Sequence, residues 1–213
     1  MNRFFFKIPM ISTTKTIVLA STSPRRAHLL RQIGVPFVVA ESGVGEDLVG
    51  TDSPVKTVKV LSLKKALSVA KRFTNAIVIG ADTIVVLDDV IYGKPNSPAQ
   101  AALYLRALSG RTHQVYTGFA LVDSDTQYSY IDYEKTDVTF RSLGDSEIAN
   151  YVNSGSPLDK AGAYGIQDDF GAVFIERING CFYTVVGFPL AKFYIAMKNF
   201  LDRVDQNNGK TNE

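Results

Sequence analysis

The chain of 213 residues is 46% hydrophobic and 21% charged, which is enough apolar content for a full core and excludes a disordered protein. Its 23 Lys and Arg residues nearly balance its 21 Asp and Glu residues, so the net charge of +2 gives no global argument for nucleic-acid binding. One cysteine excludes a disulfide framework and a cysteine-rich zinc site, and two histidines exclude a multi-histidine metal centre. Metal ions that bind carboxylates remain compatible with this composition.

The N-terminal residues 1–11 combine an early positive charge with a phenylalanine run, as a signal peptide does. Lys7 and Pro9 limit the apolar run to well below the roughly 7–15 residues that a signal peptide needs. No stretch approaches the roughly 18 apolar residues of a membrane-spanning helix. We therefore expect an N-terminal extension over residues 1–15 and a cytoplasmic protein with neither a membrane nor a nucleic acid as partner.

Three Ser-Pro pairs predict the starts of helices. Serine is a favoured N-cap, and proline suits the first helical position because its N–H would have no partner there anyway. The pairs are Ser23-Pro24, Ser53-Pro54 and Ser97-Pro98. Each precedes a helical pattern, and Gly34 ends the first one. Two further helices are expected over residues 145–153 and 189–204.

Short apolar or alternating runs between these helices predict strands. They are expected at residues 16–20, 37–40, 76–79, 83–87, 114–122, 128–136 and 138–140. Near the C-terminus, Asn179-Gly180 separates the β-rich runs AVFIERI and CFYTVV, which predicts a hairpin with a type I′ turn. Strands alternating with helices, together with hairpins, indicate an α/β fold with a mixed twisted sheet flanked by helices. We expect one domain over residues 16–204 and a disordered tail over residues 205–213.

The pair Arg25-Arg26 falls in the first turn of the first expected helix, where the positive end of the helix dipole disfavours cations. Free N–H groups at that end attract anions, so two guanidinium groups there make sense if an anion lies between them and the helix end. Ser21, Thr22 and Ser23 add hydroxyl donors. The alternative is that both arginines point into solvent, and the local sequence does not decide between the two.

Asp82 lies between two apolar runs in the segment IGADTIVV, where carboxylates are rare. A carboxylate at a break in a buried sheet is either hydrogen-bonded for structural reasons or used for metal or proton chemistry. Gly80 would let a ligand approach the backbone closely. On the local sequence alone, a structural aspartate in a turn is the more common occupant of such a position.

Two glycine-containing segments carry polar side chains suited to a nucleotide. YGKP places Lys94 before a proline-fixed turn, where a lysine can serve as a mobile charge for a phosphate. In LDKAGAYGIQ, the amide of Gln167 offers a donor and an acceptor, the pair needed to read one edge of a nucleobase. The alternatives are a surface lysine beside a turn and a packing loop, in which Asp159-Lys160 forms a local ion pair.

Several common sites are not supported. His28 and His113 have no acidic or nucleophilic partner spaced near them, and no nucleophile-elbow pattern supports a Ser-His-Asp triad. The sequence has no GxxxxGK[ST] loop and no GxGxxG, so the ordinary P-loop and dinucleotide-binding interpretations fail.

The chain resembles the Maf family, whose members are nucleoside triphosphate pyrophosphatases first described as septum-formation inhibitors. The resemblance runs from about Thr16 to about Phe200 and rests on six segments in order and approximate spacing: LASTSPRR, GADTIVV, IYGKP, LSGRTHQVYTG, LDKAGAYGIQ and VVGFPL. It implies a fold related to the inosine triphosphatase group, with two lobes around a central cleft, and a homodimer. It also implies cleavage of a nucleoside triphosphate between the α and β phosphorus atoms, with Mg²⁺ or Mn²⁺ as cofactor. LDKAGAYGIQ is similar to the segment of the branch that acts on dTTP and UTP.

The resemblance also implies roles for individual residues. Asp82 matches the catalytic aspartate, which accepts a proton from the attacking water, and Asp82 and Glu46 match the metal ligands. The positions that hold the triphosphate are matched by Ser21, Arg26, Lys65 and Lys94. The positions tied to base selection are matched by Arg25, Thr83 and Gln167. Without the resemblance, Lys65 would pass for an ordinary solvated charge on a long amphipathic helix.

Two departures from the family pattern leave questions open. Asp168-Asp169 follow Gln167 where the family usually has glycine, and this pair could loosen the base pocket, bind metal or simply be solvated on a longer loop, which we favour. A slip of register would replace Glu46 by Glu41 or Asp47.

Two other functions remain as alternatives. One is a regulatory nucleotide-binding protein of cell division that does not turn the nucleotide over. The other is a generic anion- or RNA-binding module, which the net charge of +2 and the lack of interleaved aromatic and basic residues disfavour.

Overall fold

The computed structural model describes residues 11–45, 53–167 and 170–210. Its helices are α1 (Pro24–Gln32), α2 (Pro54–Ala70), α3 (Pro98–Leu108), α4 (Asp145–Asn153), α5 (Phe182–Val186) and α6 (Leu190–Lys210). Three short 3₁₀ helices are η1 (Ser156–Asp159), η2 (Ala161–Ala163) and η3 (Phe170–Phe174). The strands are β1 (Thr16–Leu19), β2 (Val38–Val39), β3 (Ala76–Leu87), β4 (Val90–Tyr92), β5 (Thr112–Asp123), β6 (Ser129–Phe140) and β7 (Ile175–Asn179).

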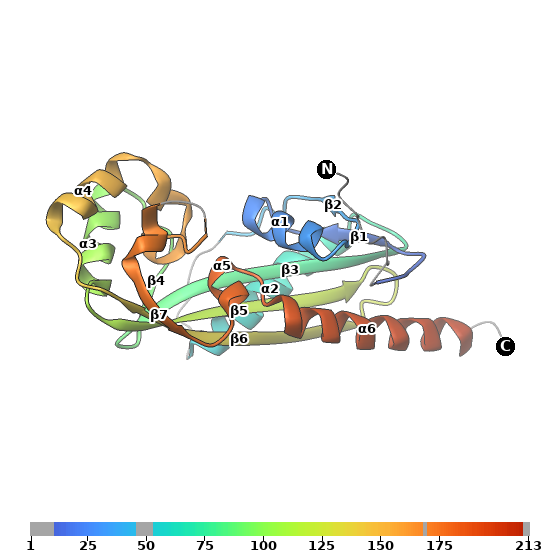
Figure 1. The fold of residues 1–213 in the computed structure, drawn as a ribbon. Helices are drawn as coiled ribbons and strands as arrows, with labels where there is room; N and C mark the ends of the chain where they lie inside the picture. The colour runs from blue at the N-terminus through green and yellow to red at the C-terminus, as the bar shows by residue number, and fades with distance from the viewer. Residues whose placement is uncertain (1–10, 46–52, 168–169, 211–213) are drawn as a thin grey trace, which may run out of the picture.

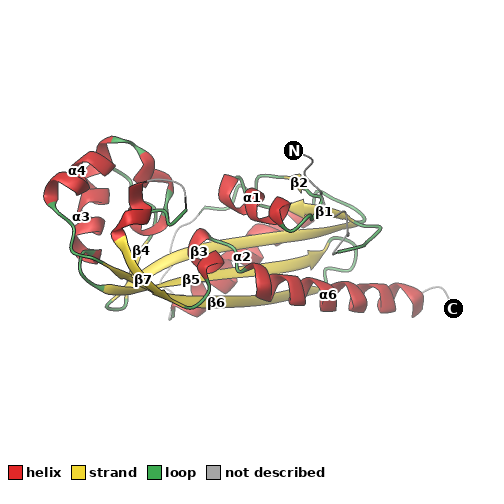
Figure 2. Cartoon of the chain, viewed as in Figure 1, coloured by secondary structure: helices red, strands yellow, loops and turns green. Residues whose placement is uncertain are grey.

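The strands form one seven-stranded mixed sheet, which confirms the predicted α/β fold with a mixed sheet and flanking helices (Figure 2). Its order is β2-β1-β3-β5-β6-β7, with β4 paired to β3. β1 pairs in parallel with β2 and β3, and the remaining pairs are antiparallel. None of the helices in the described ranges is long and apolar enough to cross a membrane.

Helices cover both faces of the sheet (Figure 1). On one face, Ile77 and Ile79 of β3 pack in a core with Phe193 and Met197 of α6. On the other face, Val78 packs in a separate core with residues of α2. This alternation follows from the strand geometry, in which successive side chains point to opposite faces. At one end of the sheet, β1, β2 and α1 form one lobe, while β4, α3 and α4 form a second lobe at the opposite end (Figure 1).

All three predicted helix starts are confirmed. α1, α2 and α3 begin at the proline of each Ser-Pro pair. The side chains of Ser53 and Ser97 accept hydrogen bonds from backbone N–H groups in the first turn, as N-caps do, whereas the side chain of Ser23 makes no such bond. The predicted bounds of α4 are also confirmed, but α6 continues past the predicted end at Val204 to Lys210.

Two predicted breaks between strands are wrong. The runs at residues 76–79 and 83–87 are parts of the single strand β3, which continues through Asp82. The runs at 128–136 and 138–140 are likewise parts of β6. Both strands are continuous because β5 supplies pairing partners at the residues where the sequence suggested a break. A hairpin that the sequence analysis did not predict follows β3, where Asp88 and Asp89 have φ of 50° and 62° and lead into β4.

The predicted hairpin at Asn179-Gly180 is also wrong. β7 pairs with β6, and the segment after Gly180 forms helix α5. Only Gly180 of the two turn residues has positive φ, +131°, and a Cβ there would lie 2.7 Å from Oγ1 of Thr136. Thr136 in turn donates a hydrogen bond to the Cys181 carbonyl at 2.9 Å. Tertiary contacts with β6 therefore override the β propensity of the run CFYTVV.

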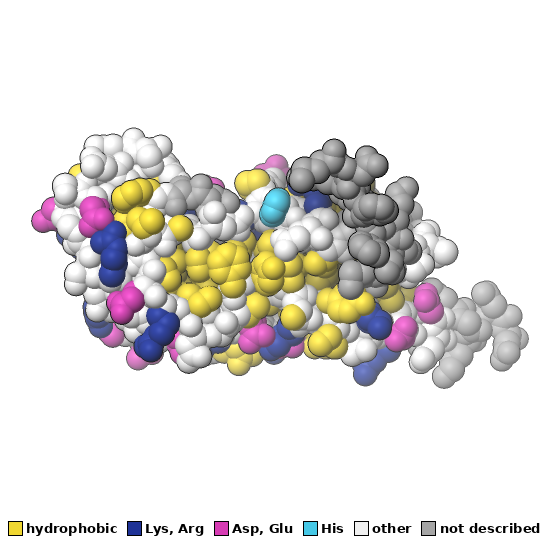
Figure 3. All heavy atoms as spheres, in the orientation of Figure 1, with side chains coloured by type: hydrophobic (Ala, Val, Ile, Leu, Met, Phe, Trp, Pro, Cys, Tyr) yellow, Lys and Arg dark blue, Asp and Glu magenta, His cyan; other side chains and the backbone are white. Residues whose placement is uncertain are grey.

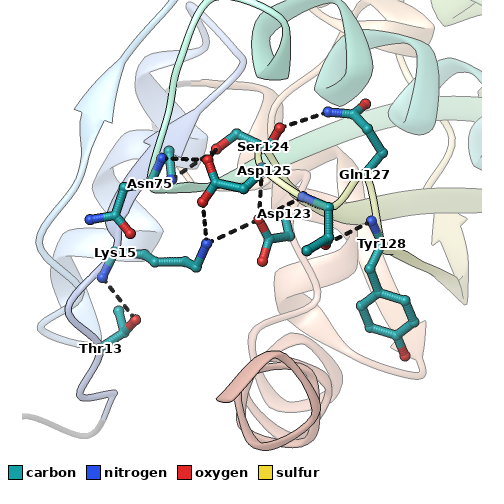
Figure 4. Close-up of polar contacts among 10 residues, drawn as sticks. Thr13, Lys15, Asn75, Asp123, Ser124, Asp125, Gln127 and Tyr128 are labelled. Carbon is teal, nitrogen blue, oxygen red and sulfur yellow. Dashed lines mark hydrogen bonds and ion pairs between the residues drawn. The ribbon is translucent and has the colours of Figure 1, made fainter. Parts of the chain in front are cut away.

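Residues 11–15 of the predicted N-terminal extension pack against the sheet. Ile11 is buried in the core beside β1 and α6. The ammonium group of Lys15 lies between two carboxylates, 3.1 Å from Asp123 and 2.6 Å from Asp125 (Figure 4). Asp125 also accepts a hydrogen bond from the backbone N–H of Asn75 at 2.8 Å. These contacts attach the chain before β1 to the turn between β5 and β6.

Candidate active site

A cavity of about 950 Å³ lies where the central strand β3 has a free edge. On the side of β3 opposite to β5, β1 pairs with residues 76–79 and β4 pairs with residues 85–87. Residues 80–84 lie between these two pairings and have no strand partner on that side within the described ranges. The cavity is therefore a cleft whose floor is the middle of β3 and whose walls belong to the two lobes.

Asp82 and Lys65 form a buried ion pair in this cleft. The ammonium nitrogen of Lys65 lies 2.6 Å from Oδ1 of Asp82, and each residue is only 4% exposed. Asp82 lies in mid-strand and Lys65 on α2, which packs directly on β3. No hydrogen bond joins Oδ2 of Asp82 to any described residue, so this oxygen is available for a water molecule or a metal ion.

Gly80 allows α2 to approach the sheet closely enough for this pair to form. A Cβ at Gly80 would lie 2.1 Å from the Ser62 carbonyl oxygen of α2. The expectation that Gly80 would admit a ligand is wrong, because the helix fills that space. Asp82, two residues later on the strand, faces the same side and meets Lys65 about one helical turn beyond Ser62. The expectation of a turn at Asp82 is also wrong, because β3 continues through this residue, which pairs with Gly118 of β5.

Arg26 connects three parts of the cleft. Its Nη1 donates to Oγ of Ser21 at 3.1 Å, its Nη2 to Oγ1 of Thr83 at 3.2 Å, and its Nε to the Gly187 carbonyl at 3.0 Å. Gly187 is the C-cap of α5 and has φ of +117°, which favours glycine. The guanidinium group is therefore held in place before any ligand binds.

Arg25 points to the opposite wall of the cleft. Its Nη1 lies 2.9 Å from Oδ2 of Asp159 and its Nη2 lies 3.1 Å from the Asp159 carbonyl. Asp159 also pairs with Lys160 at 2.8 Å, so the local ion pair that the sequence left open is present. Burial alone would raise the pKa of Asp159, but the hydrogen bonds from Lys160 and Arg25 lower this pKa below its usual value. The two neighbouring arginines thus contact different residues, and neither points only into solvent.

The cleft brings together eight of the residues that the sequence singled out. Those that line it are Ser21, Arg25, Arg26, Lys65, Asp82, Thr83, Lys94 and Gln167. Glu46 and the pair Asp168-Asp169 lie outside the described residues. Glu41, the alternative to Glu46, lines the cleft.

Three contacts could not be predicted from the sequence: those of the Gly187 carbonyl with Arg26, of the Asp159 carboxylate with Arg25, and of the Thr117 hydroxyl with Thr83. Thr117 lies directly opposite Thr83 in the pairing of β3 with β5, and their hydroxyl oxygens are 3.0 Å apart. No local pattern marks these residues, because each contact joins segments far apart in the chain. The segments VYTG and VVGFPL were recognised only through the family resemblance.

His113 is a buried structural residue next to the cleft. Its Nε2 lies 2.7 Å from the hydroxyl of Tyr164, which lines the cleft, while its Nδ1 has no hydrogen-bond partner among the residues that the structure describes. Burial lowers the pKa of His113 to about 4 and raises that of Tyr164 above its usual value. His113 is therefore neutral at pH 7. His28 is exposed on α1.

Known proteins resemble this chain over nearly its whole length. A protein named dTTP/UTP pyrophosphatase from Bacillus mycoides is 46% identical over 186 residues, covering 87% of this chain and 96% of that protein. One with the same name from Symbiobacterium thermophilum is 51% identical over 174 residues, covering 82% of this chain and 88% of that protein. The sequence model of the Maf-like proteins matches residues 16–200.

This match covers the β3 floor, both walls of the cleft and the start of α6. The expected resemblance is confirmed, and the chain belongs to the Maf-like protein family.

Proposed function

We propose that this protein hydrolyses nucleoside triphosphates, with dTTP and UTP as the expected substrates, to a nucleoside monophosphate and pyrophosphate. The observation that carries the proposal is the convergence of the Asp82 carboxylate with Arg26, Lys65 and Lys94 on one cleft. The names of the two relatives support the choice of substrates. A polyanion fits this cleft because three cations from separate elements face a single volume.

In the proposed reaction, a water molecule attacks the α phosphorus and transfers a proton to Asp82. The new bond joins the water oxygen to phosphorus, and the bond from the α phosphorus to the bridging oxygen breaks, with its electron pair leaving on pyrophosphate. Lys65 holds one oxygen of Asp82 at 2.6 Å and so fixes the orientation of the carboxylate that accepts the proton. Arg26 and Lys94 stabilise the negative charge on the phosphates, and Ser21 orients Arg26.

A divalent cation, Mg²⁺ or Mn²⁺, is part of the proposal. Mg²⁺ takes oxygen ligands and commonly uses one or two carboxylates together with substrate phosphates. Oδ2 of Asp82 fits this requirement, and Glu46 is proposed as the second carboxylate ligand. When bound, the cation would neutralise phosphate charge.

Base selection is proposed for Arg25, Thr83 and Gln167. Thr83 and Gln167 line the same cleft, so a base bound between them can be read by a hydroxyl and an amide. Arg25 is engaged by Asp159 in the absence of a ligand, so a nucleotide that uses Arg25 must compete with this ion pair.

The test is pyrophosphate release from dTTP and UTP with Mg²⁺, compared with Asp82→Asn. We expect activity in the wild type and its loss in Asp82→Asn while circular dichroism still reports a folded protein. Asp145→Asn is a matched control, because Asp145 forms an exposed ion pair with Arg106 on the far lobe. Full turnover in folded Asp82→Asn would remove Asp82 as the base. Binding of dTTP without pyrophosphate release, with any divalent ion, would instead favour a regulatory nucleotide-binding protein.

A homodimer and a cytoplasmic location complete the proposal. Hydrophobic side chains gather across the middle of the face that carries α5 and α6 (Figure 3), and exposed apolar residues on these helices include Phe182 and Ile195. Apolar patches on soluble proteins often mark interfaces, so this face is where a second copy would bind. Analytical ultracentrifugation of the wild type and Ile195→Asp checks the dimer.

A further inference from the structure

A chain of hydroxyl groups connects Arg26 to the backbone of α5 through the sheet. Arg26 Nη2 donates to Thr83 Oγ1 at 3.2 Å. Thr83 Oγ1 lies 3.0 Å from Thr117 Oγ1, and Thr117 Oγ1 lies 2.8 Å from the Thr184 carbonyl oxygen. Thr83 lines the cleft, whereas Thr117 is fully buried behind it.

The chemistry of the two ends fixes the direction of every hydrogen bond in this chain. A carbonyl oxygen only accepts, so the single proton of the Thr117 hydroxyl is used on Thr184. Thr117 can then only accept from Thr83, which means that the Thr83 proton points away from the cleft. A guanidinium group only donates, so Arg26 occupies one lone pair of the Thr83 oxygen. One lone pair remains, and towards a ligand Thr83 is an acceptor.

Burial protects this arrangement. Thr117 and Thr184 are both 0% exposed, so water cannot offer Thr117 another partner. The register of β3 on β5 places the two threonines directly opposite each other, and the C-terminal turn of α5 supplies the carbonyl. The sheet and the helix thus set the proton position of a group in the cleft.

We propose that Thr117 is a positioning residue for base selection: by accepting the Thr83 proton, it makes Thr83 select bases that carry a ring N–H. This inference rests on the proposed function, in which the cleft binds a pyrimidine nucleoside triphosphate. The N3 atom of uracil and thymine carries a hydrogen that Thr83 accepts. The N3 atom of cytosine carries a lone pair, which would face the lone pair of Thr83 and be repelled.

The test compares kcat/KM for UTP and CTP in the wild type, Thr117→Val and Thr117→Ser. Valine has nearly the shape of threonine but cannot accept the proton, so the Thr83 hydroxyl becomes free to turn and donate to cytosine. We expect the UTP-to-CTP ratio to fall by about tenfold, the effect of one uncharged hydrogen bond, with kcat/KM for CTP rising. Thr117→Ser keeps the hydroxyl and is expected to keep the wild-type ratio.

Thr136→Val is the matched control. Thr136 is also a buried threonine on the sheet whose hydroxyl donates to a carbonyl, that of Cys181, but it does not line the cleft. A purely structural loss would lower turnover of UTP and CTP alike, as expected for this control. A rise in CTP turnover cannot come from general destabilisation, so this readout separates positioning from stability.

An unchanged UTP-to-CTP ratio in active Thr117→Val, or a fall of this ratio in Thr117→Ser, would overturn the inference. If Thr117→Val does not fold, Thr83→Val replaces it in the test. The UTP-to-CTP ratio of kcat/KM must fall in Thr83→Val too, and an unchanged ratio there refutes the inference. A wild type that releases no pyrophosphate from UTP would refute the proposed function instead. The same variants are then compared by calorimetric dissociation constants for UTP and CTP, with the same change of ratio expected.

Discussion

Replacing Asp82 with asparagine is expected to cost stability as well as activity. Asp82→Asn leaves the Lys65 ammonium group beside a neutral amide. This group stays buried, since the side chains of Lys65 and Asp82 are only 5% and 6% exposed. Removing one partner of a buried ion pair costs about 3–5 kcal/mol. Because both residues line the cleft and water can reach it, we expect the lower end, about 3 kcal/mol. For a chain of this size, that corresponds to a melting temperature lower by about 6–12 °C.

Urea unfolding followed by circular dichroism measures this loss. The double variant Lys65→Met/Asp82→Asn removes both charges and is expected to recover most of the lost stability, because neither buried side chain then carries a charge that must be desolvated. It is expected to remain inactive. The exposed control Asp145→Asn should change the free energy of unfolding by less than about 1 kcal/mol.

Two results would refute this reasoning. Asp82→Asn as stable as the wild type would mean that the pair is well hydrated and that its burial contributes nothing. A double variant as unstable as Asp82→Asn would mean that the loss comes from packing rather than from the buried charge of Lys65.

Three further changes test other parts of the structure. The unfolded chain binds a proton on His113 below about pH 6.5, whereas the native pKa of His113 is about 4, so the free energy of unfolding decreases as the pH is lowered through this window. When the pH is lowered from 7.5 to 5, the free energy of unfolding in urea should decrease by about 2 kcal/mol more for the wild type than for His113→Gln. Gly80→Ala places a Cβ 2.1 Å from a backbone oxygen of α2 and should cost at least about 2 kcal/mol in thermal unfolding, whereas Gly93→Ala, with nothing within 4 Å, should cost less than about 0.5 kcal/mol. Lys15→Met leaves the buried Asp123 carboxylate without its cation and should cost about 3 kcal/mol in urea unfolding.

Each of these has a result that contradicts it. Equal pH dependence in the wild type and His113→Gln would mean that this histidine does not resist protonation. Wild-type stability of Gly80→Ala would mean that α2 moves away from β3 without cost. Wild-type stability of Lys15→Met would mean that the segment before β1 contributes nothing.

Helix starts could be predicted from the sequence because their chemistry is local. A serine N-cap and a proline at the first helical position act within one turn, so the starts at Pro24, Pro54 and Pro98 are readable without tertiary structure. The ends of β3 and the helical state of residues 182–186 are not local. They depend on β5 and β6, whose hydrogen bonds and threonine hydroxyls outweigh the preferences of the segments themselves.

The candidate site was only partly predictable for the same reason. Asp82 was singled out because a carboxylate inside an apolar strand needs an explanation. Its partner Lys65 looked like a solvated charge, since nothing local shows that Gly80 brings α2 onto the strand at that point. The family resemblance identified Lys65 as a site residue, but neither the resemblance nor the local sequence identified Asp159 as the partner of Arg25.

The shared floor strand has a consequence for how the protein recognises its ligand. Both walls of the cleft are hydrogen-bonded to the same strand, β1 near its start and β4 at its end, while β5 braces it from Ile77 to Val86. Swinging one wall away from the other would require twisting this braced ladder rather than bending a flexible linker. A change in the width of the opening therefore has to deform this ladder, and discrimination between ligands falls to the side chains that the frame holds in place.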